Sequence, residues 1–205
     1  MTKCHACGAA RVERTVLPTH EDTLLGAPFA IILENAVAEE SCATCGHRIG
    51  LLYPNLSGMI AAVAMARALY PEKLCPAEVR FLRKAMGWRQ KELAKKLHKT
   101  VETVSRWESG GLPMALDAEK HLRLHVCFAL AEHAPLVDFE PEQILELQIR
   151  PMRLVGSRLE MRCRPVTLNL ADLHPQPANI SLGELSRDRE KWNAAFRHQQ
   201  SPAAA

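Results

Sequence analysis

The stretch that decides the fold runs from residue 76 to residue 110 and reads PAEVRFLRKAMGWRQKELAKKLHKTVETVSRWESG. Its apolar residues recur three or four positions apart in three short runs, and Gly87 and Gly110 end the first and the third. Because that spacing gathers apolar side chains on one helix face, the stretch predicts three helices joined by two tight turns. Thr100 suits the N-cap of the third helix. The predicted helices span residues 76–86, 90–97 and 100–109.

The third predicted helix has an inward face of Val104 and Trp107 and a polar outward face. On the outward face Glu102 and Arg106 are four positions apart, so both point the same way. A short exposed helix that follows a tight turn and presents polar side chains fits the major groove of DNA. The pattern therefore indicates a DNA reader.

The charge of the chain supports this interpretation. Residues 76–110 hold nine Lys or Arg and four Glu, a net charge of +5, whereas the whole chain has a formal net charge of +3. The positive charge is thus confined to the stretch that would touch phosphates. The alternative is an ordinary helical bundle with a solvated basic face, but the helix order, the turns and the charge all favour a DNA-binding domain.

This stretch resembles the helix-turn-helix of the phage-repressor family, the Xre/Cro/cI-like proteins. The shared signature consists of Leu82-Arg83, Gln90, Leu93-Ala94 and Val104-Ser105-Arg106-Trp107-Glu108 before Gly110. The resemblance implies that Gln90 touches the DNA backbone or an outer base, and that Arg83 pairs with Glu108. We expect Gln90 to position the domain and Arg106 to specify a guanine. His98 departs from the pattern, because many members have Gly in this turn. The residues expected to contact DNA are Gln90, Lys91, Lys99, Val101, Glu102, Thr103, Ser105 and Arg106.

Two cysteine motifs lie near the N-terminus, Cys4-His5-Ala6-Cys7-Gly8 and Cys42-Ala43-Thr44-Cys45-Gly46. Each motif is a knuckle that offers two thiolates from a tight turn, and four thiolates suit a tetrahedral zinc ion. The segments 12–17 and 29–37 have strand-like patterns, so a small sheet is expected between the knuckles. The sequence predicts one structural zinc ion per chain, held by Cys4, Cys7, Cys42 and Cys45.

Other uses of the cysteines and their neighbours are less well supported. A redox dithiol needs one C-x-x-C on a thioredoxin-like scaffold, of which the sequence gives no sign. A catalytic zinc keeps an open coordination position, whereas four thiolates close the shell. His5 or His47 could substitute as a ligand, but both lie beside complete cysteine pairs. Cys75, Cys127 and Cys163 have no partner spacing and are expected to behave as small apolar residues.

Two knuckles, a helical connection and an Xre-like helix-turn-helix together resemble the MqsA-type antitoxins, whose N-terminal part is also called a YgiT-type zinc finger. The resemblance covers roughly residues 1–130, and the chain continues for about 75 residues beyond the family's usual end. It implies structural zinc, an N-terminal part that contacts a cognate toxin, and a C-terminal domain that dimerises and represses its operon. The family's base-reading Asn and Arg fall on Glu102 and Arg106. A carboxylate at position 102 would favour the N4 donor of cytosine.

The remaining segments are read from their periodicity. Residues 57–70 predict an Ala-rich helix capped by Ser57, and residues 117–133 predict a helix capped by Asp117. His121 and His125 are four positions apart on the second helix, but no third ligand is evident and a solvated face is the preferred interpretation. Residues 144–168 alternate apolar and polar side chains around a turn, which predicts a two-stranded hairpin.

Together these features predict a mainly α protein. Its expected parts are an N-terminal Cys4 zinc-binding module with a small β-sheet (1–56), a helical linker (57–73), a central five-helix helix-turn-helix domain (74–135), a C-terminal β-hairpin extension (136–172), and a linker, helix and disordered tail (173–205). The sequence has no run of about 18 apolar residues and no signal-peptide pattern, so we expect a cytoplasmic protein without a membrane span.

The expected function is a sequence-specific repressor that binds a double-stranded DNA operator as a homodimer and has no catalytic chemistry. One alternative is an antitoxin that works mainly by neutralising a cognate toxin, and another is a stand-alone regulator. The least favoured alternative is an enzyme that uses the C-x-x-C thiols or zinc for chemistry.

Overall fold

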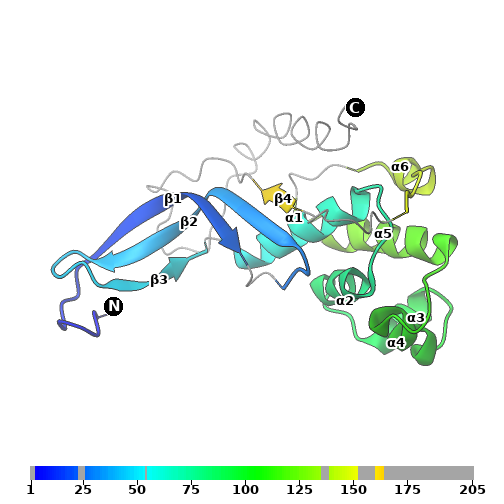
Figure 1. The fold of residues 1–205 in the computed structure, drawn as a ribbon, viewed down its shortest axis with the longest axis horizontal. Coiled ribbons are helices and arrows are strands. Elements are labelled where there is room, and N and C mark those ends of the chain that lie inside the picture. Colours follow the sequence, from blue (N-terminus) through cyan, green and yellow to red (C-terminus); the bar gives the residue numbers. More distant parts are fainter. Residues whose placement is uncertain (1–2, 23–25, 54, 135–138, 152–159, 164–205) are drawn as a thin grey trace.

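The structure is a computed structural model, and it describes residues 3–22, 26–53, 55–134, 139–151 and 160–163. A small β-sheet forms one end of the elongated molecule and a group of helices forms the other, with α1 between them (Figure 1). The strands are β1 (Val12–Asp22), β2 (Ala30–Cys42), β3 (Arg48–Leu52) and β4 (Glu160–Cys163). The helices are α1 (Leu56–Leu69), α2 (Pro76–Ala85), α3 (Gln90–Lys96), α4 (Val101–Ser109), α5 (Leu116–Leu130) and α6 (Pro141–Leu145).

The N-terminal sheet is antiparallel in the order β1-β2-β3. β1 and β2 pair along their length, from Val12 opposite Cys42 to Asp22 opposite Ile31, with one irregularity beside Pro18, which has no N–H to donate. The two predicted strand segments are therefore parts of longer strands, and the small sheet is confirmed. β3, which follows the second knuckle directly, was not predicted.

The three central helices were predicted almost to the residue. α2 begins at Pro76, α3 at Gln90, and α4 follows Thr100, whose side chain accepts the backbone N–H of Thr103 at 3.2 Å. Gly110 ends α4 with a φ of 83°, a left-handed conformation that suits glycine. Local capping and helical periodicity agree here, so the sequence prediction succeeds.

Two predicted helix caps are wrong. α1 is capped by Asn55, whose Oδ1 accepts the Gly58 N–H at 2.9 Å, while Ser57 lies within the first turn. α5 begins after Ala115, and Asp117 lies in its first turn, where a carboxylate favours the positive helix end without capping it. In both places a polar side chain close to the helix start was mistaken for the cap itself.

The hairpin predicted for residues 144–168 is also wrong in its described parts. Pro141 starts the short helix α6, and Ile144 is buried on it at 1% exposure. Arg150 instead forms an isolated bridge with Glu72, and β4 pairs in parallel with β2. The predicted turn at 155–157, the linker, the helix at 181–198 and the tail lie outside the described residues.

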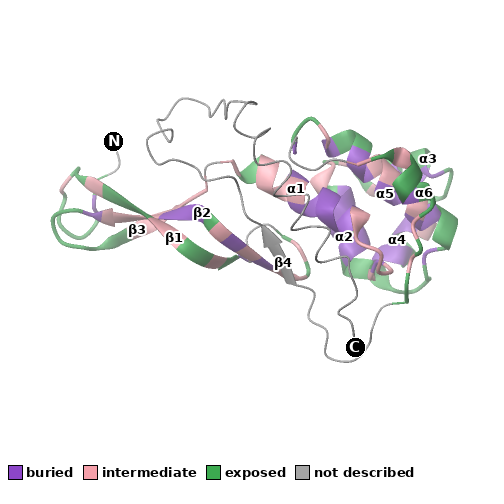
Figure 2. Cartoon of the chain, turned by 90° about the horizontal axis from the view of Figure 1, so that it is seen from above, coloured by how far each residue is buried: buried purple, intermediate pink, exposed green. Residues whose placement is uncertain are grey.

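One apolar core joins the sheet to the helices. Ile31 and Leu33 of β2 belong to the same cluster as the buried residues of α1, α2 and α5. The rings of Phe29 and Phe81 meet edge to face with their centroids 5.8 Å apart. Buried residues accordingly recur along α1 and α2 (purple in Figure 2). α1, expected to be a linker, packs on α2 and α5, while the proposed domain boundaries remain predictions.

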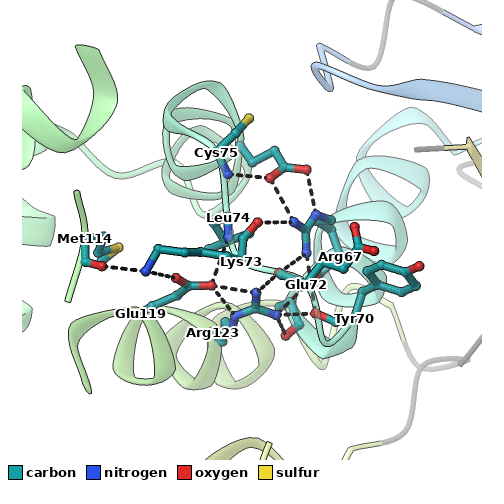
Figure 3. Close-up of polar contacts among 11 residues, drawn as sticks. Arg67, Tyr70, Glu72, Lys73, Leu74, Cys75, Met114, Glu119 and Arg123 are labelled. Atoms are coloured by element: carbon teal, nitrogen blue, oxygen red, sulfur yellow. Dashed lines mark hydrogen bonds and ion pairs between the residues drawn. The ribbon is translucent and has the colours of Figure 1, made fainter. Parts of the chain in front are cut away.

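Two buried arginines fix the connection between α1 and α2, which we call the joint (residues 70–75; Figure 3). Arg67 pairs with Glu78, with Nε 2.7 Å from Oε1, and Arg123 pairs with Glu119, with Nη2 2.7 Å from Oε1. The remaining guanidinium N–H groups bind backbone carbonyls of the joint and of the end of α1. The helix that leaves the sheet is thereby held to the helix-turn-helix. No helix in the described part of the chain is long and apolar enough to cross a membrane.

Candidate metal centre and nucleic-acid interface

The four knuckle cysteines converge at the end of the sheet. Their sulfur atoms all lie within 4.8 Å of one another, with Cys4 Sγ 3.7 Å from Cys45 Sγ and Cys7 Sγ 3.5 Å from Cys42 Sγ. Four sulfurs about 2.3 Å from a tetrahedral zinc ion would lie about 3.8 Å from one another. The cluster therefore has the dimensions of a closed metal site.

The two knuckles have the same backbone design. In each, the glycine N–H donates to the carbonyl of the first cysteine at 2.8 Å, from Gly8 to Cys4 and from Gly46 to Cys42. Both glycines have a positive φ, 73° and 71°. The turn needs that conformation to bring both sulfurs to one side, which is why C-x-x-C-G is an informative motif.

The pKa values of the cluster thiols also indicate that all four ionise together only around a bound cation. Backbone N–H groups of Cys45 and Thr44 lower the pKa of the Cys42 thiol from 9.0 to about 6. At Cys7 the N–H of Ala9 acts in the same direction, but hydrogen bonds with Cys45 and Cys42 outweigh it and raise the pKa to about 12. Four thiolates this close would repel one another, so a bound cation is needed to ionise them all. These four cysteines can bind a metal ion.

No second metal site is evident in the described ranges, where the four cysteines are the one group of suitable ligands. His121 is exposed, and the ring of His125 instead meets that of Trp88 edge to face at 5.7 Å. Burial, together with the charge of Lys96, lowers the pKa of His125. The structure thus supports the solvated or packed interpretation of these histidines.

The outward face of α4 is open to solvent. Val104 and Trp107 are buried at 0% and 4% exposure, as expected for the inward face. The predicted DNA-contacting residues Val101, Glu102, Ser105 and Arg106 are exposed, and Thr103 is half-buried. α4 therefore presents the predicted set along one face, with Lys91 and Lys99 exposed nearby on α3 and in the turn.

Glu102 and Arg106 differ in how free they are. Glu102 turns back to the start of α4, where its own backbone N–H and the Thr100 side chain lower the pKa of its carboxyl, helped by the charge of Arg106. Arg106 forms no ion pair within the described part of the chain. Of the two, Arg106 is the side chain available for an outside partner.

The turn between α3 and α4 holds a residue in a strained conformation. His98 has a φ of 51°, in the left-handed region that favours glycine. Many family members have Gly in this turn, so His98 departs from the family pattern at a position where the backbone adopts a left-handed conformation.

A cluster around Glu108 ties the three central helices together. The carboxylate of Glu108, buried at 4% exposure, receives Arg83 of α2, with Nε 2.5 Å from Oε1 and Nη2 3.0 Å from Oε2. Gln90 Nε2 of α3 donates to Oε2 at 3.0 Å. Arg80, an exposed residue that the sequence analysis missed, donates from Nη2 to the Glu108 backbone carbonyl at 3.0 Å. Its spacing of three from Arg83 is the signal that could have revealed it.

One of three comparisons with known proteins, the one with protein families, gives a match. Neither the curated proteins nor the solved structures yield a match, so the MqsA-type resemblance stays a prediction. Residues 79–125, which include most of α2 and α5 and all of α3 and α4, match the helix-turn-helix family. The match supports binding to double-stranded DNA and a regulator rather than an enzyme. The chain thus contains an Xre/Cro/cI-like helix-turn-helix domain over residues 79–125.

Proposed function

We propose that the protein is a sequence-specific transcriptional repressor that binds an operator as a homodimer. The observation that carries the proposal is the exposed face of α4 on a helix-turn-helix scaffold, where Arg106 has no ion pair with any residue that the structure describes. An arginine in the major groove can donate two hydrogen bonds to guanine O6 and N7. Repression then follows from equilibrium occupancy of the operator and needs no catalytic group.

We also propose that the metal is one structural zinc ion. Cys4, Cys7, Cys42 and Cys45 would hold it, and bound zinc would supply a cross-link between the two ends of the sheet's first hairpin. Because four thiolates close the coordination shell, the site would not activate water. This argues against the alternative in which the thiols or the metal perform chemistry.

A second candidate function is neutralisation of a cognate toxin. It is favoured by the sheet, which bears the four cysteines at one end and projects away from α4 (Figure 1). Co-purification from the native host, with the bound DNA and protein identified, separates this function from a stand-alone regulator. A stoichiometric small protein partner would favour the antitoxin, and DNA alone would favour the regulator.

The repressor proposal is tested by changing Arg106 and one lysine in parallel. Arg106→Ala should weaken the operator complex and relax the preference at one base pair per half-site by about 1–3 kcal/mol. Lys95→Ala, which removes an exposed charge of α3, should weaken all DNA about equally and reduce the salt slope by about one unit for each half-site. Binding of both variants to operator and scrambled DNA is measured across salt concentrations. An unchanged ratio of operator to scrambled affinity in Arg106→Ala would mean that α4 is not the reader.

A further inference from the structure

Besides Arg83, Glu108 of α4 contacts one side chain from each of the two helices that precede it in the helix-turn-helix, Arg80 and Gln90. One oxygen, Oε2, receives Gln90 Nε2 at 3.0 Å and also lies 3.8 Å from Arg80 Nε. Both side chains therefore approach the same atom and must lie close to each other. They come from different helices, Arg80 from α2 and Gln90 from the first position of α3.

The contact with Glu108 determines which end of the Gln90 amide is free. An ionised carboxylate can only accept hydrogen bonds, so the amide group that faces it must be the NH2 group. Burial alone would raise the pKa of Glu108, but the hydrogen bonds from Arg83 and Gln90 lower it, so the carboxylate is ionised at neutral pH. Gln90 keeps its Oε1 acceptor and one N–H for an outside partner.

An amide presented in this way is a poor partner for a phosphate. Its free oxygen would repel the phosphate oxygens, and a stronger donor is available beside it. The side chain of Arg80 is 52% exposed and carries a full positive charge with several N–H groups. A phosphate that approached this corner of the domain would therefore bind Arg80.

The remaining groups of Gln90 match one base edge. Adenine presents an N6 donor and an N7 acceptor in the major groove, and an amide oxygen with one N–H complements both. Gln90 lies at the leading end of α3 and is half-buried, so part of its side chain is accessible while its NH2 group is held by Glu108.

We propose that Glu108 divides the DNA contacts of this corner between two side chains, with Arg80 binding a phosphate and Gln90 reading an outer adenine. The resemblance left open whether Gln90 touches the DNA backbone or an outer base, and we expected it to position the domain rather than to specify a base. The proposal assigns it a base and rests on the proposed function as a DNA-binding repressor. Glu108 is the positioning residue: it turns the Gln90 amide and holds Arg80 beside it without touching DNA.

The experiment begins with selection of binding sites from random DNA by the full chain. The wild type, Gln90→Ala, Arg80→Ala and Arg14→Ala are then titrated with the selected site and scrambled DNA across salt concentrations. Arg14→Ala is the matched control, because Arg14 is an exposed arginine of β1 paired with Glu40. It should leave both the base preference and the salt slope unchanged.

Gln90→Ala should lose about tenfold of discrimination at one adenine per half-site and keep the salt slope. Replacing that adenine by 2-aminopurine, which lacks the N6 amino group, should weaken the wild type and leave Gln90→Ala unaffected. Arg80→Ala should keep every base preference and reduce the salt slope by about one unit for each half-site. Glu108→Gln, if it folds as judged by thermal melting, should relax the preference at the same adenine, because its amide no longer fixes that of Gln90.

The proposal is overturned if Gln90→Ala weakens the selected site and scrambled DNA equally, whatever its salt slope, or if Arg80→Ala changes a base preference. Should Glu108→Gln not fold, the two surface variants decide the question alone. A wild type that selects no consensus at all would overturn the repressor function itself, whereas a selected consensus with the wrong variant pattern overturns only this division of contacts.

Discussion

His98 occupies a backbone conformation that suits glycine, with a φ of 51° in the turn before α4. A side chain in the left-handed region costs about 1 kcal/mol, partly offset by the larger entropy that glycine has in the unfolded chain. We therefore expect His98→Gly to raise the free energy of unfolding by about 0.5 kcal/mol. Urea unfolding followed by the fluorescence of the buried Trp107 measures this change.

Gly87 provides the matched control for that experiment. Its φ is 72° and a Cβ at this position would meet no atom within 4 Å, so a substitution changes conformation alone. Gly87→Ala should lower the free energy of unfolding by about 1 kcal/mol. If His98→Gly also lowered the free energy of unfolding, the left-handed backbone of His98 would not be a source of strain.

The proposed zinc site gives a second prediction at the residue scale. Cys42→Ser removes one of four ligands and should release the metal, loosen the sheet and leave the helices of residues 76–130 folded. Metal analysis together with circular dichroism checks both parts. Cys75→Ser, which changes a half-buried cysteine outside the cluster, should keep the full metal content. Finding no zinc in protein purified without chelator would contradict the assignment of the metal.

Single residues were predictable where the motif is local. The C-x-x-C-G knuckles encode their own turns, and Thr100 caps the helix that follows it. The contact between Gln90 and Glu108 joins residues 18 positions apart, so no periodicity could reveal it. To predict such a contact, one must know how α3 and α4 pack against each other.

At the scale of elements, prediction succeeded for helices with a strong apolar period and failed where alternation was short. Residues 145–149 alternate like a strand, yet the segment begins in the helix α6, which starts at Pro141, buries Ile144 and packs on α5, and residues 146–149 form neither helix nor strand. Tertiary packing decides between the two periods in a segment of this length. β3 was missed for a related reason, because its five residues are too few for a pattern.

The joint between α1 and α2 gives the prediction at this scale. Arg123 is fully buried, and removing it would take from the buried Glu119 its strongest ion pair, leaving it the Leu74 N–H and Lys73 Nζ at 3.8 Å. It would also remove a hydrogen bond from three backbone carbonyls, two of which keep one from Arg67. We expect Arg123→Met to lower the free energy of unfolding by about 3 kcal/mol or more. Denaturant unfolding of the full chain measures the change.

An exposed ion pair serves as the comparison for the joint. Arg14 and Glu40 pair across β1 and β2, with side chains 43% and 20% exposed. Because solvent screens such a pair, Arg14→Ala should cost less than about 1 kcal/mol. A loss from Arg123→Met as small as that from Arg14→Ala would mean that the buried network does not hold the joint.

At the scale of the whole molecule, the helix-turn-helix domain and the four-cysteine cluster were predictable from the sequence, but the way they are connected was not. The linker predicted for residues 57–73 proves to be a buried helix, α1, that shares its core with both β2 and the helix-turn-helix. Its apolar stripe was visible, but which neighbours cover that stripe depends on the tertiary arrangement. The sheet that bears the metal cluster and the helix-turn-helix therefore share one apolar core.

The proposed homodimer follows from how little DNA one copy of α4 can read. A nine-residue helix contacts only a few base pairs, so useful specificity needs two copies on half-sites about one helical turn apart.

α5 is a candidate surface for the partner, since Phe128 is 58% exposed on it. Phe128→Glu should then weaken dimerisation and operator binding together by tenfold or more, as about 1.4 kcal/mol corresponds to a tenfold change. Leu56→Glu, at a 45% exposed position of α1, is the control and should change neither. Sedimentation gives the oligomeric state, and inserting about five base pairs between the half-sites should abolish tight binding by turning them to opposite faces of the duplex. The homodimer proposal would be wrong if the protein sedimented as a monomer both free and on DNA and bound the DNA with the insertion as tightly as the original operator. A single α4 would then read the operator.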